Sequence, residues 1–166
     1  MVLMGMDNKG FKIILTAERC MMSDYHKSLF LGFCACAPKK LWNSFIFFHF
    51  ICPQTPTYDN GKCKLAPYGT RKIEAALLEY GFSEEDVVVV SPEHIHDYVG
   101  PETKVIGVTS NDPLGRGPAS TTFSAPTGFF RNKGEPYDAW KFRELVTDPY
   151  LKRWGAKIVV GGPGAW

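Results

Sequence analysis

The sequence predicts an α/β fold in which an open parallel sheet is flanked by helices. Short runs rich in β-branched residues alternate with amphipathic segments of helical spacing along most of the chain. One of these runs, 86–90, contains four consecutive valines, which is typical of an interior strand covered on both faces. Parallel strands are joined by right-handed crossovers, so the elements fit a Rossmann-like sheet.

The first strand is expected at 11–16, an apolar run rich in β-branched residues after a polar start. A long irregular insertion follows at 18–64. Within it, the aromatic run 42–51 is too short for periodicity to separate helix from strand, and we favour a helix. Residues 53–63 form a loop, because the sequence Asp59-Asn60-Gly61 is a strong turn signal.

A helix is predicted at 69–81, because apolar residues recur at helical spacing and Gly81 is placed to end it. The four-valine strand comes next. A turn or short helix at 91–100 then leads to a parallel strand at 103–110.

Residues 112–134 read as a polar loop rich in glycine and proline, too long for an idle connection in a compact domain. Tyr137 to Trp154 is an amphipathic helix, which Pro149 breaks or divides. The last buried strand is 156–160. We therefore expect a single domain spanning 1–166.

Composition excludes several classes of function. The 166 residues carry a net charge of +2 with basic and acidic residues intermixed, so a nucleic-acid surface is not expected. The apolar run 45–52 is too short to cross a bilayer, and no membrane partner is expected. The odd number of cysteines without a secretory signal indicates a reducing cytoplasm. We interpret Cys34 and Cys36 as free thiols, because no second pair completes a metal site.

Ligands of open parallel sheets bind outside the carboxyl ends of the strands. The expected ends are Thr16-Ala17, Ser91-Pro92, Thr109 to Leu114 and Gly161 to Gly164. Glycine and small hydroxyl residues at the last two ends would let a large ligand approach the backbone.

A dinucleotide site has weak support. The segment 115–120, "GRGPAS", carries two glycines of the GxGxxG pattern, but it follows a later strand and we expect no helix after it. A phosphate-binding GxxxxGK[ST] loop is absent from the sequence. A nucleotide- or flavin-binding domain therefore stays an alternative.

Four segments together resemble a known family: "KIILTAERCMMSDY", "LAPYGTRKIEAAL", "KVIGVTSNDPLGRGPAS" and "AKIVVGGPGAW". They are similar to the N-terminal cobalamin-binding-type domain of cobalamin-dependent radical S-adenosylmethionine proteins. The similarity covers most of 11–166. It implies a cobalamin-binding module in which the cofactor lies at the carboxyl ends of the strands.

Cobalamin domains of the mutase type carry a D-x-H-x-x-G motif, whose place is taken here by residues 64–69. Lys64 stands in place of the aspartate and Ala66 in place of the ligand histidine, so the resemblance implies a cobalt without a protein imidazole. Pro67 would fix this loop and preset the helix start, and Tyr68 or Leu65 would face the corrin ring.

The serine loop of those domains corresponds to Thr109 and Ser110, and their GG pair to Gly161-Gly162, which would pass under the nucleotide tail or the corrin edge. Asp112 is either a loop cap or a hydrogen-bonding partner of the cofactor. The full set of cofactor-binding residues implied by the resemblance is Leu65, Ala66, Pro67, Tyr68, Gly69, Thr109, Ser110, Asp112, Leu114, Gly161, Gly162 and Pro163.

The cysteines do not form the CxxxCxxC motif that holds a radical [4Fe–4S] cluster. The chain alone is therefore not expected to be catalytic. The resemblance implies a parent methyltransferase or related oxidoreductase, whose downstream barrel would hold the [4Fe–4S] cluster and S-adenosylmethionine. A scaffold or docking domain that has lost the cofactor is a second alternative.

The histidines are interpreted without a role in catalysis. We expect His94 and His96 to be surface or capping residues and His49 to lie in the core. The aromatic cluster 45–50 is expected in the core, or, if exposed, at an interface with another domain.

Overall fold

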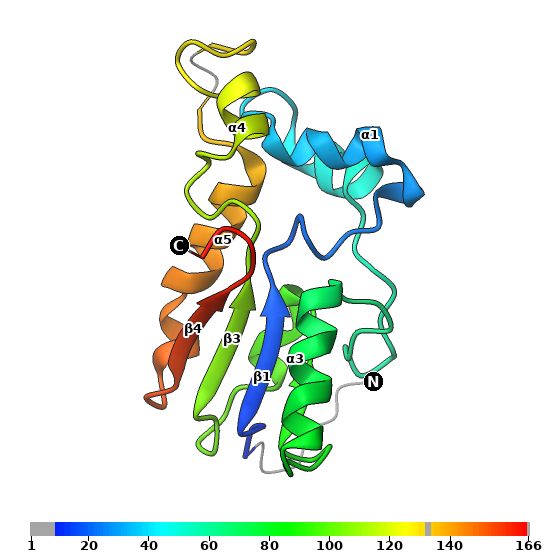
Figure 1. Cartoon of the computed structure of the whole chain (residues 1–166), viewed down its shortest axis with the longest axis vertical. Coiled ribbons are helices and arrows are strands. Elements are labelled where there is room, and N and C mark those ends of the chain that lie inside the picture. The colour runs from blue at the N-terminus through cyan, green and yellow to red at the C-terminus, as the bar shows by residue number, and fades with distance from the viewer. Residues whose placement is uncertain (1–8, 132–133, 166) are drawn as a thin grey trace.

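The computed structural model describes residues 9–131 and 134–165. Its centre is a four-stranded, all-parallel sheet with the strand order β2-β1-β3-β4 (Figure 1). The strands are β1 (Ile13–Ala17), β2 (Val87–Val89), β3 (Val105–Thr109) and β4 (Lys157–Gly161). Each lies within, or within one residue of, a predicted strand. The predicted α/β class and open parallel sheet are confirmed.

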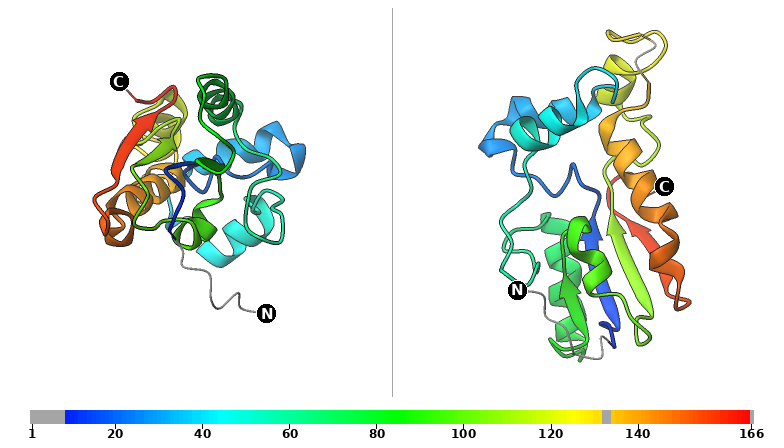
Figure 2. Two further views of the ribbon diagram at one scale, coloured as in Figure 1. Left: turned by 90° about the horizontal axis from the view of Figure 1, so that it is seen from below. Right: turned by 180° about the vertical axis from the view of Figure 1, so that it is seen from behind.

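Helices cover the two faces of the sheet unequally. On one face, α3 (Tyr68–Glu79) packs against β1 and β2 over a core that contains Leu15 and Val89. On the other face lie η4 (Pro92–Asp97), α5 (Tyr137–Thr147) and η5 (Pro149–Lys152). Figures 1 and 2 show α3 and α5 on opposite sides of the sheet. No described helix lies over β3 and β4 on the α3 side.

Strand β4 lies at the edge of the sheet. Its neighbour β3 pairs with it from Val105↔Lys157 to Thr109↔Gly161, and no described strand pairs with its other side. Val159 and Val160 point to opposite faces, and both are exposed. The prediction that this strand is buried was therefore wrong, because β4 is the edge strand of the described sheet and has a strand on one side only.

The insertion after β1 forms a cap beside the carboxyl ends of the strands. We use "the cap" for residues 25–52, which contain five short helical segments: η1 (Tyr25–Lys27), α1 (Leu29–Gly32), η2 (Phe33–Cys36), α2 (Ser44–Ile46) and the π-helical η3 (Phe47–Ile51). The helix predicted in 42–51 is confirmed. The cap has its own core, in which the rings of Phe47 and Tyr137 stack with centroids 3.7 Å apart.

The aromatic run of the cap is only partly core. Phe47 is fully buried, but Phe45, His49 and Phe50 are exposed, and His49 stacks on Phe45. The prediction of a core histidine was wrong. Phe48 lies between these extremes, because it is half-buried and its ring meets that of Tyr137 edge-on at 5.7 Å.

The cap begins with an unusual backbone. Tyr25, His26 and Lys27 have φ angles of 47°, 54° and 62°, which makes one left-handed turn without glycine. Asp24 accepts a hydrogen bond from the backbone N–H of His26, and Nε2 of His26 lies 2.9 Å from the carbonyl oxygen of Phe50. These two hydrogen bonds stabilise positive φ angles that residues other than glycine usually avoid.

The long loop predicted at 112–134 contains a short helix that the sequence did not predict, α4 (Pro118–Phe123). The predicted interruption near Pro149 is confirmed, because α5 ends at Thr147 and η5 begins at Pro149. His94 and His96 are partly exposed, as expected, and Nε2 of His96 lies 2.6 Å from a carboxylate oxygen of Asp148.

Candidate functional site

An apolar groove of about 260 Å³ lies on the α3 side of the sheet, where no described helix covers β3 and β4. Its floor comes from β1, β3 and β4, and its wall from α3. The lining residues are Ile13, Leu15, Thr70, Ile73, Leu77, Val105, Gly107, Val108, Thr109, Val159 and Gly161. The groove ends at the carboxyl ends of the strands, where the sequence predicted a ligand.

The start of α3 is fixed to the end of β3 by one buried hydrogen bond. The hydroxyl oxygens of Thr70 and Thr109 lie 2.9 Å apart, and both side chains are buried. Pro67 occupies the N-cap position of α3 with φ −53°, so it presets the helix entrance as predicted. The segments 65–70 and 109–110, far apart in sequence, therefore meet at one edge of the groove.

The glycines at the groove differ in what a side chain would meet. A Cβ at Gly69 or Gly161 would meet no atom within 4 Å, so both positions open onto free space. A Cβ at Gly107 would lie 2.8 Å from Cδ2 of Leu15, which keeps the floor close-packed.

Gly162 and Gly164 lie where the loop after β4 packs closely against the loop after β3. Gly162 has φ +101°, and a Cβ there would lie 2.5 Å from the carbonyl oxygen of Ser110. The backbone N–H of Ser110 donates to the carbonyl of Gly161 at 3.0 Å, and that of Gly164 donates to Ser110 at 3.4 Å. The loops that follow β3 and β4 are thus clamped into one rim.

Other predicted site residues fall into two groups. Leu65, Tyr68, Leu114 and Pro163 are exposed around the carboxyl ends of the strands. Ala66 instead packs against the core under α3. Ser110 is buried on the other face from Thr109, and its hydroxyl has no hydrogen-bond partner among the described residues.

Asp112 caps the loop that follows β3. Its two carboxylate oxygens accept hydrogen bonds from the backbone N–H groups of Arg116 and Gly117, each at 2.8 Å. The segment "GRGPAS" does precede a helix, α4, so the expectation of no helix there was wrong. The N–H groups that a phosphate would need are already bound to the protein's own carboxylate, which weighs against a dinucleotide site there.

Sequence reasoning missed a buried acidic cluster between the sheet and the cap. Glu18 and Asp138 are almost fully buried. Burial raises the pKa of Asp138 to about 7, and burial together with the nearby Asp138 raises that of Glu18 well above its usual range. The position of Glu18 directly after β1 was the only sequence signal, and no pattern linked it to α5.

Two buried thiols lie beside this cluster. A hydrogen bond with Cys20 and contacts with Tyr25 and Arg19 lower the pKa of Cys52 to about 7, whereas burial raises that of Cys20. Cys34 and Cys36 are partly exposed free thiols, as expected. Among residues 9–131 and 134–165, no group of three or more candidate ligands could hold a metal ion.

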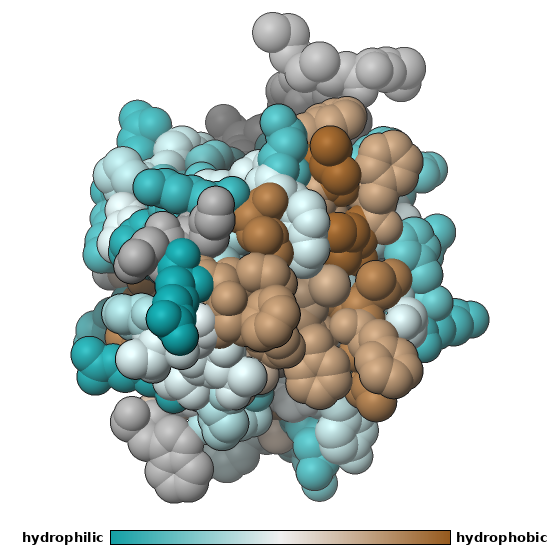
Figure 3. All heavy atoms as spheres, turned by 90° about the horizontal axis from the view of Figure 1, so that it is seen from above, coloured by the Kyte–Doolittle hydropathy of each residue, from teal (hydrophilic) through white to brown (hydrophobic). Residues whose placement is uncertain are grey.

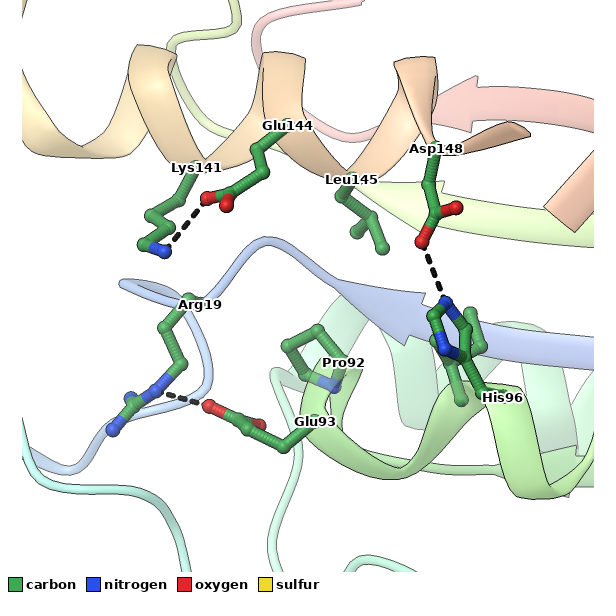
Figure 4. Close-up of a pocket in the computed structure, with 9 residues that line it drawn as sticks. Arg19, Pro92, Glu93, His96, Lys141, Glu144, Leu145 and Asp148 are labelled. Atoms are coloured by element: carbon green, nitrogen blue, oxygen red, sulfur yellow. Dashed lines mark hydrogen bonds and ion pairs between the residues drawn. The ribbon is translucent and has the colours of Figure 1, made fainter. Parts of the chain in front are cut away.

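A second pocket, of about 230 Å³, lies between η4 and α5 on the opposite side of the sheet (Figure 4). Its charged side chains form pairs: Arg19 with Glu93, Lys141 with Glu144 at 2.6 Å, and His96 with Asp148. Because each charge already has a partner, the pocket offers a ligand no free ionic group.

Neither family models, curated proteins nor solved structures gave a match to this chain. Within the described parts of the chain, no helix is long and apolar enough to span a bilayer. The resemblance to cobalamin domains therefore rests on the sequence segments that carry it.

Proposed function

We propose that the chain is a corrinoid-binding module that holds cobalamin at the carboxyl ends of β3 and β4 without a histidine ligand. The observation that carries the proposal is that one residue of each of three implied segments, Thr70, Thr109 and Gly161, lines the same apolar groove. These are the segments that the resemblance assigned to the cofactor.

The residues present fit such a group in shape and in chemistry. Gly161 lines the groove and has free space beside it, as does Gly69 at the start of α3, and a flat apolar group could occupy that space. The hydroxyls of Thr70 and Thr109 in its wall are bonded to each other, so the groove would hold a ligand mainly through apolar contacts. A volume of about 260 Å³ accommodates only part of a ligand as large as cobalamin. The remainder would lie on the exposed side chains of Leu65, Tyr68 and Leu114.

Each part of the site would then have a distinct task. The groove would bind the nucleotide tail, with Gly161 beneath it, and the exposed rim would support the corrin ring. Ala66 stands where a ligand histidine would be, and it packs into the core, so the chain offers no imidazole at that position. Bound cobalamin would supply a cobalt centre able to carry a methyl group, and the protein would orient it.

Binding of hydroxocobalamin to the purified chain tests the proposal. We expect the protein to retain the corrin absorption after desalting, and its thermal unfolding midpoint to rise with cobalamin concentration. Gly161→Trp should fill the groove and lower the affinity at least tenfold. Gly32→Trp is the matched control, because a Cβ at Gly32 also meets no atom within 4 Å but lies in α1, in the cap.

Two outcomes would contradict the proposal. If folded protein at high micromolar concentration retains no corrin and its unfolding midpoint does not move, the scaffold alternative is favoured. If flavin or adenine nucleotide binds instead and Gly161→Trp abolishes that binding, the groove belongs to a different cofactor. Titrations with both ligands should therefore run in parallel.

A further inference from the structure

The cap carries an exposed apolar surface that the proposed cofactor site does not use. We define the apolar crest as six side chains of α1, η2, α2 and η3, each between 49% and 83% exposed: Leu29, Phe30, Phe33, Phe45, Ile46 and Phe50. Figure 3, which looks down on the molecule of Figure 1, shows apolar side chains gathered on the side where the cap lies. Patches of this kind mark interaction surfaces.

Acidic residues are scarce in the cap, although the exposed Asp24 lies directly before it. Residues 25–58 contain no aspartate or glutamate, although the chain has 17 acidic residues, and they contain Lys27, Lys39 and Lys40. Nζ of Lys39 lies 2.7 Å from Glu135, whereas Lys27 and Lys40 have no carboxylate partner in the described parts of the chain. The cap therefore carries two exposed lysines, Lys27 and Lys40, that are not paired with a carboxylate in the described parts of the chain.

From these observations we infer that the crest binds the surface of a membrane containing anionic phospholipids. Leu29 and Phe30 protrude furthest, at 81% and 83% exposed, and a lipid surface accepts protruding side chains without a complementary pocket. Lysines beside the inserted residues are attracted to anionic headgroups. A second copy of the chain would instead bring the same lysines together, and residues 25–58 contain no acid to pair them.

This inference is independent of the proposed cofactor site, and it revises the expectation that the chain has no membrane partner. That expectation rested on the length of the apolar run, which concerns a helix crossing the bilayer. A surface-bound protein needs only side chains that reach the acyl boundary and cations that reach the headgroups. The short helices of the cap are sufficient for that.

Cosedimentation with vesicles tests the inference. We expect the protein to bind sucrose-loaded vesicles of 70% phosphatidylcholine and 30% phosphatidylglycerol, and at least tenfold more weakly to pure phosphatidylcholine. The double variant Phe30→Ser, Phe45→Ser should weaken binding about tenfold or more. Phe129→Ser is the matched control, because Phe129 is 80% exposed but outside the cap.

The role of charge is tested separately. The double variant Lys27→Glu, Lys40→Glu should remove most of the preference for anionic vesicles, whereas Lys104→Glu, at the start of β3 and far from the cap, should not. The fluorescence of Phe45→Trp should shift to shorter wavelength when vesicles are added. Circular dichroism must show that each variant is folded.

Three results would overturn the inference. The first is folded protein that does not bind anionic vesicles. The second is vesicle binding that the double variant Phe30→Ser, Phe45→Ser leaves unchanged. A dimer in light scattering that the crest variant dissociates, without vesicle binding, would assign the crest to a second copy instead.

Discussion

Asp138 shows how a single buried carboxyl couples the fold to pH. Its pKa is about 7 in the folded protein because burial penalises the charged form, whereas an aspartate in the unfolded chain ionises near pH 4. The carboxyl of Asp138 therefore binds its proton more tightly in the folded state than in the unfolded state. The contribution of this carboxyl to stability should be lost as the pH rises from about 4 to about 7, and it should stay constant above that range.

Asp138→Asn is expected to remove this part of the pH dependence. The variant should lose less stability than the parent between pH 5 and pH 8, by a few kcal/mol at most. Urea denaturation at the two pH values measures the difference. Asp59→Asn, in an exposed loop, is the control. An equal loss of stability in parent and Asp138→Asn would show that this carboxyl is ionised in the fold.

The hydrogen bond between Thr70 and Thr109 should contribute measurably to stability. Thr70→Val or Thr109→Val should each cost about 1–3 kcal/mol, because the remaining hydroxyl is left buried without a partner. The double variant should cost less than the sum of the two. A double-mutant cycle from denaturation curves measures the coupling. Strictly additive losses would mean that the two hydroxyls do not depend on each other.

The sequence alone drew attention to Gly161 and Gly162 but could not assign their structural roles. Gly161 and Gly162 are adjacent, but only Gly162 lies against the loop that follows β3, where a Cβ would meet Ser110. In the same way, Asp112 could be described as a cap or as a ligand group until its two N–H donors were known. Contacts between segments distant in sequence decide such questions.

At the scale of elements, the two adjacent glycines at the end of β4 should respond differently to substitution by alanine. Gly162→Ala should lose about 1–3 kcal/mol, because its φ is +101° and its Cβ would collide with the backbone of Ser110. Gly161→Ala, whose Cβ meets nothing within 4 Å, should change stability by less than about 0.5 kcal/mol. Thermal denaturation of the pair measures this. Equal losses would contradict the clamp between the two loops.

Strands and long helices could be predicted because their periodic patterns are local. The sheet and α3 follow from apolar runs and helical spacing, and the break before η5 follows from Pro149. Helix α4 was missed because "PASTTF" is short and polar, and its start depends on Asp112. The burial of the aromatic run could not be predicted, because only packing against Tyr137 selects Phe47 for the core.

At the scale of the whole molecule, the described residues form three separate apolar cores, one on each face of the sheet and one in the cap. Phe47→Ala should cost about 3–5 kcal/mol, since this ring is fully buried in the cap core. Hydrogen exchange should then lose protection in the cap before it does in β1 and β3.

The exposed Phe45 provides a matched control for that prediction. Phe45→Ala should change stability by less than about 0.5 kcal/mol, although it lies two residues away in the same run. Uniform loss of protection across cap and sheet in Phe47→Ala would show instead that the two regions unfold as a single cooperative unit.

The left-handed turn at residues 25–27 has a stereochemical consequence. An L-residue resists positive φ by about 1–2 kcal/mol, and the mirror-image residue prefers it. Lys27 is exposed, with φ 62°. If chemical synthesis replaced only this residue by D-lysine, composition and charge would be unchanged, yet the protein should become more stable by a similar amount. At this turn, therefore, the handedness of one α-carbon opposes the fold that its sequence encodes.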